Sequence, residues 1–227
     1  MTARTPDEAE GDPPMTYTEP ATAARTIRPG GPEDTDRLCG LLAEAFQDDP
    51  LTAWILPDPV ERAAALPAFF RVFVDLSLAH GGVLVGGVGG DFAAALLYLS
   101  PAGWEEAQER DEDVQRRLAE AVGSGTAALF TILAMQAAHH PSEEPQYYAS
   151  FGAVRPGEQQ GGWMTGMLGL LVARADAEGV PTYVEASSPG GYAVSLRNGF
   201  APLGTEIRLP DGPVLRPMWR PARRSGA

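Results

Sequence analysis

The sequence predicts a mixed α/β fold with a central, partly antiparallel sheet flanked by helices. Two apolar strands, at 83–85 and 92–99, are joined by a glycine-rich turn, which is the pattern of a hairpin. Apolar residues recur every three to four positions on both sides of this hairpin, which indicates amphipathic helices. Strands and helices alternate only in the second half of the chain, so a regular, doubly wound parallel sheet is not expected.

The first half of the chain begins with a short strand at 26–29 and continues into two helices. Asp34 or Thr35 can cap the first helix, because short polar side chains accept hydrogen bonds from the free amides at a helix start. The apolar face of this helix consists of Leu38, Leu41, Leu42, Ala45 and Phe46. A break at 48–50 separates it from a second helix over Pro59–His80, which carries a stripe of phenylalanines.

The second half supplies the remaining helices and strands. Helical periodicity covers 105–122 and 126–138, and a strand at Tyr147–Val154 leads through a polar loop into a helix that ends at Ala177. The last predicted elements are a strand at 183–186, a short helix at 192–198, a strand at 200–209 and a closing strand at 215–219.

Length and composition are those of one packed domain. The chain has 227 residues, of which 44% are apolar, and this is enough for a single hydrophobic core. Residues 1–24 lack periodicity and are rich in Thr, Pro, Ala, Asp and Glu, so they are predicted to form a disordered tail. The domain is placed at 25–221, and 222–227 is predicted to be a flexible C-terminal tail.

The charge balance bears on the kind of partner. The net charge is −13, and the chain contains arginine but no lysine. An acidic balance argues against binding to DNA, which requires clustered positive charge. It is compatible with steering of a cationic substrate, and also with a role in solubility alone.

The sequence gives no targeting or metal-binding signal. No apolar run approaches the ~18–20 residues of a membrane span, and the N-terminus lacks a signal-peptide pattern. The protein is therefore expected to be cytoplasmic, with no membrane partner. The single cysteine, Cys39, excludes an internal disulfide framework and a cysteine-rich metal site, and no metal is expected.

The most informative segment is the polar, glycine-rich loop between the strand Tyr147–Val154 and the helix that follows. A strand that leads into a helix N-terminus presents backbone amides, which form a binding site for an anion such as a phosphate. The residues placed in this site are Val154, Gln159, Gln160, Gly161, Gly162, Trp163, Met164 and Thr165. The alternative interpretation is a glycine-rich turn that binds no ligand.

Short segments spread along the chain form a recognisable set. They are 45–50 (AFQDDP), 140–148 (HPSEEPQYY), 154–162 (VRPGEQQGG), 175–187, 197–200 (RNGF), 210–213 (PDGP) and 218–220 (MWR). Together they resemble the GNAT superfamily of N-acetyltransferases, and within it the puromycin N-acetyltransferase-like branch. The resemblance covers roughly residues 26–220.

This resemblance implies an N-acyltransferase that moves an acetyl group from acetyl-CoA to the amine of a small metabolite or antibiotic-like compound. It implies that the loop amides bind the CoA pyrophosphate and that the pantetheine arm pairs with the strand Tyr147–Val154. The amine would attack the thioester directly. The partners are then the amine acceptor and the CoA thioester, and the protein is expected to be a monomer or homodimer.

The chain departs from the family pattern at three positions. Met164 stands where the loop pattern has a small residue, Gly191 replaces a frequent asparagine, and Ser195 replaces a tyrosine credited with protonating the leaving thiolate. Met164 either crowds the cofactor loop or points into the core. Two alternatives therefore stay open: a GNAT-like enzyme with another acyl donor (a longer acyl-CoA or an aminoacyl-tRNA), and a non-catalytic GNAT-like binding domain.

Candidate catalytic residues follow from the chemistry, because a protonated amine must lose a proton before it attacks. Glu185 is the candidate base, since partial burial beside its apolar neighbours would raise the pKa of its carboxyl group toward the working range. The alternative is a carboxylate on a solvated face. Ser195 can hold a water, and Tyr192, one helical turn earlier, is either a substitute acid or a packed side chain.

The candidates for contact with the acceptor are Asp48, Asp49, Trp54, Tyr147 and Tyr148. In the family the region of the two aspartates lines the acceptor cleft, and a cationic acceptor would fit it, although an Asp-Asp-Pro sequence also caps or breaks a helix. The two aspartates and the two tyrosines are further candidates for a base or a proton relay. Trp54, like Trp104, lies at the end of a predicted element, where a cleft wall is expected.

Overall fold

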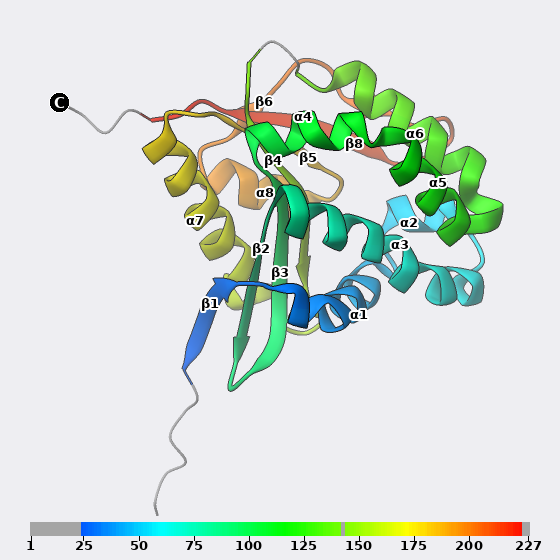
Figure 1. The fold of residues 1–227 in the computed structure, drawn as a ribbon, viewed down its shortest axis with the longest axis horizontal. Coiled ribbons are helices and arrows are strands. Elements are labelled where there is room, and N and C mark those ends of the chain that lie inside the picture. The colour runs from blue at the N-terminus through cyan, green and yellow to red at the C-terminus, as the bar shows by residue number, and fades with distance from the viewer. Residues whose placement is uncertain (1–23, 142–143, 224–227) are drawn as a thin grey trace, which may run out of the picture.

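The computed structural model describes residues 24–141 and 144–223 and shows an eight-stranded sheet with helices on both faces (Figure 1). The strands are β1 (Arg25–Pro29), β2 (Gly81–Val88), β3 (Asp91–Leu99), β4 (Tyr147–Val154), β5 (Thr182–Ala186), β6 (Ala201–Pro202), β7 (Ile207–Arg208) and β8 (Val214–Arg220). Their order is β1-β2-β3-β4-β5-β8-β6, with β7 paired to β8 off this path. Only β4 and β5 are parallel among these pairs of described strands, so the predicted mixed, partly antiparallel sheet is confirmed.

The helices form a thick layer on one face of the sheet and a thin layer on the other. They are α1 (Thr35–Phe46), α2 (Pro50–Ile55), α3 (Pro59–His80), α4 (Pro101–Glu109), α5 (Asp111–Val122), α6 (Thr126–His139), α7 (Trp163–Glu178) and α8 (Pro189–Arg197). One core cluster joins α1, α3, α5 and α6 to the sheet, and a second joins α7 to the opposite face, with α8 packed beside it (Figure 1).

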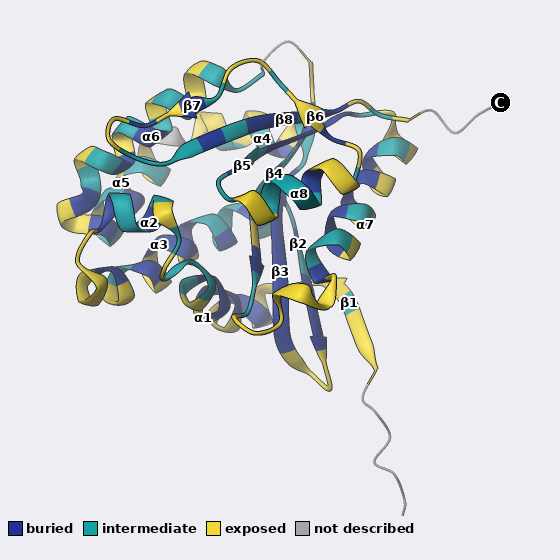
Figure 2. Ribbon diagram, turned by 180° about the vertical axis from the view of Figure 1, so that it is seen from behind, coloured by how far each residue is buried: buried dark blue, intermediate teal, exposed yellow. Residues whose placement is uncertain are grey.

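Strand β3 is the centre of both cores. Ala94, Leu96 and Tyr98 belong to the cluster on the α7 face, whereas Ala95 and Leu97 belong to the cluster on the α1 and α3 face. Successive side chains of a strand point to opposite faces, and here both faces are covered by helices. This explains why the strand reads as an uninterrupted apolar run and why it is buried along its length, while the edge strand β1 is exposed (Figure 2).

Strands β4 and β5 pair over a short distance and then separate. The parallel pairing is confined to 147–149 and 182–184, whereas β4 continues along β3 to Val154. A bulge in the β3–β4 pairing leaves Ser150 opposite no residue, so Tyr148 and Phe151 contact the same helical layer although they are three positions apart. The separation leaves one edge of β4 without a strand partner.

Most predicted elements are confirmed, and the exceptions have local causes. The break predicted at 48–50 is also the start of α2, because Asp49 accepts a hydrogen bond from the Leu51 amide at 2.8 Å and caps a helix that was not expected. The helix predicted at 105–122 is divided at Arg110 into α4 and α5. The strand predicted at 200–209 is divided into β6 and β7, which lie on either side of a turn containing Gly204 (φ 62°).

Asp34 lies at the start of α1 but does not cap it with its side chain. Its carboxylate instead accepts hydrogen bonds from both terminal nitrogens of Arg28, at 2.6 and 2.9 Å, and from the Gly31 amide at 3.1 Å. The hydrogen bond from Arg28 is the main reason why the pKa of Asp34 is lowered. The expected cap is therefore wrong in its role, because the carboxylate ties β1 to the turn before the helix.

Two helical segments, Pro59–His80 and Glu112–His139, are long and apolar enough to span a membrane by length and composition, contrary to the expectation from the sequence. The first is α3, which buries Leu66 and Phe70 in the core. The second is interrupted by the 3-10 turn at Gly123–Gly125. Both segments pack into the core of this domain, and core helices of globular proteins commonly have this length and composition.

A buried ion pair joins β8 to the end of α7. The two terminal nitrogens of Arg220 each donate to one carboxylate oxygen of Asp176 at 2.7 Å, and Nε donates to the Asn198 carbonyl at 3.1 Å. Arg220 is buried, and its hydrogen bonds lower the pKa of Asp176. The amide of Arg223 also donates to Asp176 at 2.6 Å, so this part of the predicted C-terminal tail is held. The remaining tail predictions, at 1–23 and 224–227, lie outside the described residues.

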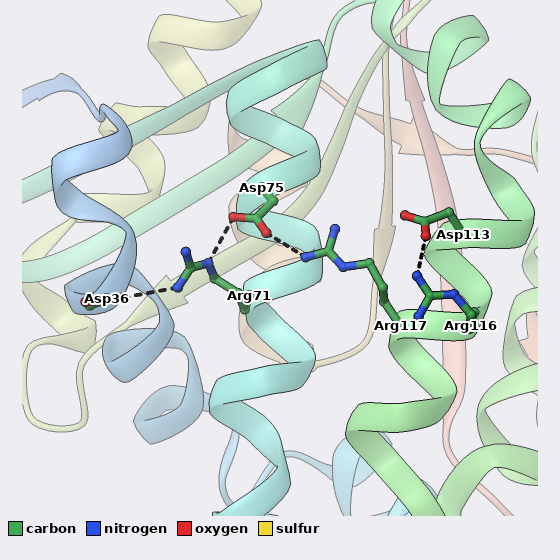
Figure 3. Close-up of polar contacts among 6 residues, drawn as sticks. All are labelled: Asp36, Arg71, Asp75, Asp113, Arg116 and Arg117. Carbon is green, nitrogen blue, oxygen red and sulfur yellow. Dashed lines mark hydrogen bonds and ion pairs between the residues drawn. The ribbon is translucent and has the colours of Figure 1, made fainter.

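A chain of exposed ion pairs connects helices across the thick layer (Figure 3). Arg71 of α3 binds Asp36 of α1 at 3.2 Å and Asp75 at 3.0 Å, and Asp75 also binds Arg117 of α5 at 2.6 Å. Exposed pairs contribute only about 0–1 kcal/mol each, because solvent screens them. The surface chain is therefore expected to matter less for stability than the buried pair.

We expect Asp176→Asn to lower the free energy of unfolding at pH 7 by about 2–4 kcal/mol, because it leaves the buried guanidinium of Arg220 without a counter-charge. Asp113→Asn removes the exposed contact with Arg116 that Figure 3 draws; it is the matched control and should leave stability nearly unchanged. Denaturant unfolding monitored by circular dichroism measures both.

The pH dependence gives a second check on the same variant. Since the pKa of Asp176 is lowered in the folded state, its contribution is complete above the unfolded pKa of about 4 and declines as the pH falls through the folded value. The stability difference between the wild type and Asp176→Asn should therefore shrink in acid. Equal losses for the two variants at pH 7 would contradict the assignment.

Candidate functional site

A cavity of ≈ 960 Å³ runs through the place where β4 and β5 separate. On the face of α7 and α8, its walls include Gln159, Met164, Leu168, Val194 and Ser195. On the opposite face, its walls include Phe46, Phe69, Phe73, Phe151, Leu129 and Leu133. The cavity thus connects the two faces of the sheet, and two molecules that enter from opposite faces can meet at the β4–β5 gap.

The predicted anion-binding loop leads directly into the N-terminus of α7. After β4, the chain makes a 3-10 turn at Gln159–Gly161, and Gly162 adopts a left-handed conformation with φ 73°. No side chain caps the helix, so the first amides of α7, from Trp163 to Thr165, have no acceptor within the helix. These amides and the positive end of the helix dipole favour a negatively charged group.

Met164 points toward β4. A Cβ atom added at Gly152 would lie 2.8 Å from Sδ of Met164, so a larger residue at 152 would require the thioether to shift. Met164 lines the cavity and also packs against the apolar cluster under α7. Of the two alternatives, crowding of the loop or packing in the core, the structure shows the packing.

The other residues predicted for the cofactor loop line two different cavities, or neither. Val154 and Gln159 line the main cavity with Met164. Gly161, Gly162 and Trp163 line a smaller cavity of ≈ 450 Å³ together with Arg25. Gln160 is exposed and Thr165 is half-buried.

Arg25 was not predicted for this site, and only the folded chain brings it there. Its Nη2 donates to the Gly161 carbonyl at 2.5 Å, and its guanidinium lies 3.8 Å from the centre of the buried Trp163 ring. The residue is separated from the loop by 136 positions in the chain. It adds a positive charge beside the α7 N-terminus, which no local sequence signal could have shown.

Glu185 lies in the cavity wall and is held by neutral hydrogen-bond donors. Its Oε1 accepts from the Tyr183 hydroxyl at 2.9 Å, and its Oε2 accepts from the Gln136 amide and, at 3.4 Å, from the Tyr148 hydroxyl. Tyr183 and Glu185 share a face of β5 because they are two positions apart. Strand periodicity could therefore have predicted Tyr183 as a neighbour of Glu185, whereas no sequence pattern indicated Gln136 of α6.

Burial decides the electrostatics of this group. It raises the pKa of Glu185, and the hydrogen bonds from Gln136, Tyr183 and Tyr148 and the nearby His139 only partly oppose it. Burial also raises the pKa of Tyr148 and of Tyr183, with the neighbouring carboxylate adding to the effect. Glu185 is therefore half-buried in the cavity wall and its pKa is raised, as the sequence predicted.

An aromatic wall adjoins the carboxylate. The rings of Trp104 and His140 stack at 3.8 Å, and Tyr148 meets both edge-on, with ring centres 5.4 and 5.1 Å away. Burial lowers the pKa of His140 to about 4, so its ring is neutral at physiological pH. Trp104 lines the cavity as expected for a cleft wall.

The two aspartates predicted to contact the acceptor separate in the structure. Asp49 lines the cavity and its burial raises the pKa of its carboxyl group, against the effect of hydrogen bonds from the Leu51 and Thr52 amides. Asp48 is exposed and is not among the residues that line the cavity. The structure therefore brings only one of the pair to the cavity.

Three other predicted residues do not line the cavity. Tyr147 points to the opposite face of β4, where its hydroxyl donates to Glu178 at 2.6 Å. Trp54 donates from its indole nitrogen to the Pro210 carbonyl at 3.1 Å. Tyr192 packs against the α7 face, with Arg216 5.8 Å from its ring centre. These side chains have structural contacts that sequence position alone did not reveal.

Ser195 lines the cavity from α8, yet it is buried and already committed to a hydrogen bond. Its hydroxyl donates to the Gly191 carbonyl at 3.0 Å, which leaves the oxygen free to accept. Among the described residues, no group of three or more His, Cys, Asp or Glu side chains lies close enough together to hold a metal ion. The described residues that line the cavity supply the carboxyl group of Glu185, hydroxyl groups and an amide at the start of α7.

No protein-family model matches the chain. Among solved structures, it is similar to a Corynebacterium glutamicum protein named histone acetyltransferase HPA2 and related acetyltransferase, with 24% identity over 89% of this chain and 99% of the other and a TM-score of 0.68. A polyamine N-acetyltransferase of Drosophila melanogaster shows 16% identity over 87% and 100%, with a TM-score of 0.60. Arylalkylamine N-acetyltransferase 2 of Aedes aegypti shows 15% identity over 88% and 99%, also with a TM-score of 0.60. The chain has the fold of these N-acetyltransferases.

We expect the His140 ring to remain neutral between pH 5 and pH 8, because protonation would place a charge in a buried aromatic wall. An NMR titration of the histidine ring signals measures this, and His140→Asn assigns the signal among only three histidines. A midpoint near the ordinary histidine value of about 6.5 would show that the ring is solvated and that the wall is open.

Proposed function

We propose that this protein is an N-acyltransferase that moves an acetyl group from acetyl-CoA to the amine of a small molecule. The observation that carries the proposal is the single cavity that joins the N-terminus of α7 to the buried carboxyl group of Glu185 through the β4–β5 gap. The fold shared with N-acetyltransferases supports it. The motifs resembling the puromycin N-acetyltransferase-like branch support a metabolite or antibiotic-like acceptor.

The acyl donor would bind along the loop and β4. The uncapped amides at the start of α7 can donate hydrogen bonds to the pyrophosphate of CoA, and Arg25 places a positive charge nearby. The free edge of β4, beyond Ala149, offers backbone groups to the amides of the pantetheine arm. Met164 borders this path and restricts its width above Gly152.

The acceptor would approach from the other face of the sheet. Its amine reaches the β4–β5 gap beside Glu185, whose raised pKa brings it closer to the pH at which a carboxylate is an efficient proton acceptor. The ammonium group passes one proton to Glu185, from which it reaches solvent. The neutral amine then attacks the thioester carbonyl carbon, so a C–N bond forms as the C–S bond breaks.

The second proton of the amine nitrogen balances the reaction. It leaves as the amide forms, and one proton is taken up by the departing CoA thiolate. Ser195 occupies the position of the family's tyrosine but donates to the Gly191 carbonyl. A thiolate is a good leaving group, so the loss of a dedicated acid costs only about 10²-fold at the low end of general-acid effects.

CoA should bind with a micromolar dissociation constant in isothermal titration calorimetry, and Gly162→Asp should weaken binding by about tenfold or more, because it places a negative charge at the α7 N-terminus. Gly179→Asp is the matched control at the other end of the same helix. The two glycines have φ of 73° and 71°, and a Cβ atom at either one would have no other atom within 4 Å.

The two variants carry the same strain and the same charge, so only the position of the charge differs. Equal affinities for CoA in the two variants would contradict the assignment of the pyrophosphate to the α7 N-terminus. Absence of heat with millimolar CoA would overturn the acyltransferase proposal as a whole.

Glu185→Gln should lower kcat by about 10²-fold while leaving the dissociation constant of CoA nearly unchanged, because a carboxamide cannot accept the proton. In the wild type, kcat should rise with pH through the raised pKa of Glu185, since the ionised form is the base. The exposed Glu105→Gln is the control and should behave as the wild type. A thiol-release assay measures turnover, and unchanged turnover in Glu185→Gln would exclude it as the base.

A further inference from the structure

The arm of the cavity that reaches under α1, α3 and α6 is lined mainly by apolar side chains. Four phenylalanine rings meet there, with Phe46, Phe70 and Phe73 all within 5.8 Å of the Phe151 ring centre. Phe46, Phe73 and Phe151 line the cavity, and Phe70 is buried behind them. This arm can bury an apolar group of considerable size.

The apolar arm continues along α6, on the side away from the anion-binding loop. Leu129, Ile132 and Leu133 of α6 line it together with Ile55 of α2. Leu129 and Ile132 are buried in the core cluster, whereas Leu133 is half-buried at the cavity surface. Each methylene group that a ligand buries here is worth roughly 0.8 kcal/mol, or about fourfold in affinity.

The two carboxylates in the cavity wall have different hydrogen-bond partners. Among the described residues, its charged side chains are Asp49, Glu185 and the exposed Arg197. The hydrogen-bond partners of Glu185 are all neutral, and His139 is the titratable neighbour that acts on it. Asp49, in contrast, is compensated by the backbone amides at the start of α2.

An ammonium group at Glu185 would complete this arrangement. The carboxylate supplies the counter-charge, and the Tyr148 hydroxyl that contacts it belongs to the aromatic wall with Trp104 and His140. An acceptor that carries a carboxylate would bring a further negative charge beside Asp49 and Glu185. A second ammonium group would have to be buried among phenylalanines or displace the amides that Asp49 already holds.

We infer, on the basis of the proposed function, that the acceptor is a primary amine with one cationic group and an extended apolar body. Its ammonium end binds at Glu185, and its body occupies the phenylalanine-lined arm of the cavity. This arm therefore selects the acceptor and does not hold the acyl chain of the donor.

The test is binding of four molecules with the same six-carbon chain to the full-length protein without any CoA. The probes are hexylamine, 1-hexanol, 1,6-diaminohexane and 6-aminohexanoate, and tryptophan fluorescence or calorimetry measures the dissociation constants. We expect hexylamine to bind about tenfold or more tightly than each of the others, because only it combines one cation with an apolar end.

The variants assign the two ends of the ligand. Glu185→Gln should abolish the preference for hexylamine over hexanol, whereas the exposed Glu105→Gln should retain it. Leu133→Phe should weaken the binding of hexylamine by about tenfold and leave the binding of ethylamine nearly unchanged, because the substitution narrows only the apolar arm. Thermal unfolding confirms that each variant is folded.

Several results would overturn the inference while leaving the proposed function intact. Equal dissociation constants for hexanol and hexylamine would contradict a cation site at Glu185. Tighter binding of the diamine than of hexylamine would indicate a second cation site, at Asp49. Absence of amine binding, together with faster turnover of a hexanoyl-CoA donor than of acetyl-CoA, would assign the arm to the acyl chain. CoA binding and thiol release, measured separately, test the proposed function itself.

Discussion

The short pairing between β4 and β5 is the constraint on which the rest of this structure depends. Parallel strands normally remain paired along their length, yet here contact ends after three positions, at Ala149 and Val184. Strand β4 stays with β3 through a bulge at Ser150, while β5 stays with β8. The gap joins the two faces of the sheet, because the cavity that runs through it is lined by residues from both helical layers.

The carboxyl group beside the gap is partly removed from water, and nearby hydrogen bonds offset the resulting loss of stability. A buried carboxyl group destabilises a fold unless hydrogen bonds compensate its charge. At Glu185 the hydroxyls of Tyr148 and Tyr183 and the amide of Gln136 provide this compensation without neutralising it. The buried pair of Arg220 and Asp176, far from the cavity, is neutralised instead, which suits a structural contact between β8 and α7.

Sequence patterns were sufficient for the fold and for part of the site. Periodicity located α1, α3 and β4, because in each of them packing and local propensity agree. The strand–loop–helix pattern located the free amides at the start of α7, since they depend on backbone and not on side-chain identity. Periodicity did not reveal that Tyr147 and Tyr192 point away from the cavity, or that Trp54 is held by Pro210. Those orientations are set by contacts between elements.

What the sequence by itself determined is the mixed α/β fold, most of its elements and their order, and the free amides at the start of α7, because these follow from local properties of the chain. Only the tertiary structure decided which side chains meet in one cavity. It brought Gln136 from α6 to Glu185, placed Arg25 beside Gly161, and turned Met164 onto Gly152. These contacts join positions that are distant in the chain, and their geometry follows from strand register, a bulge and helix packing, none of which is written in a local pattern.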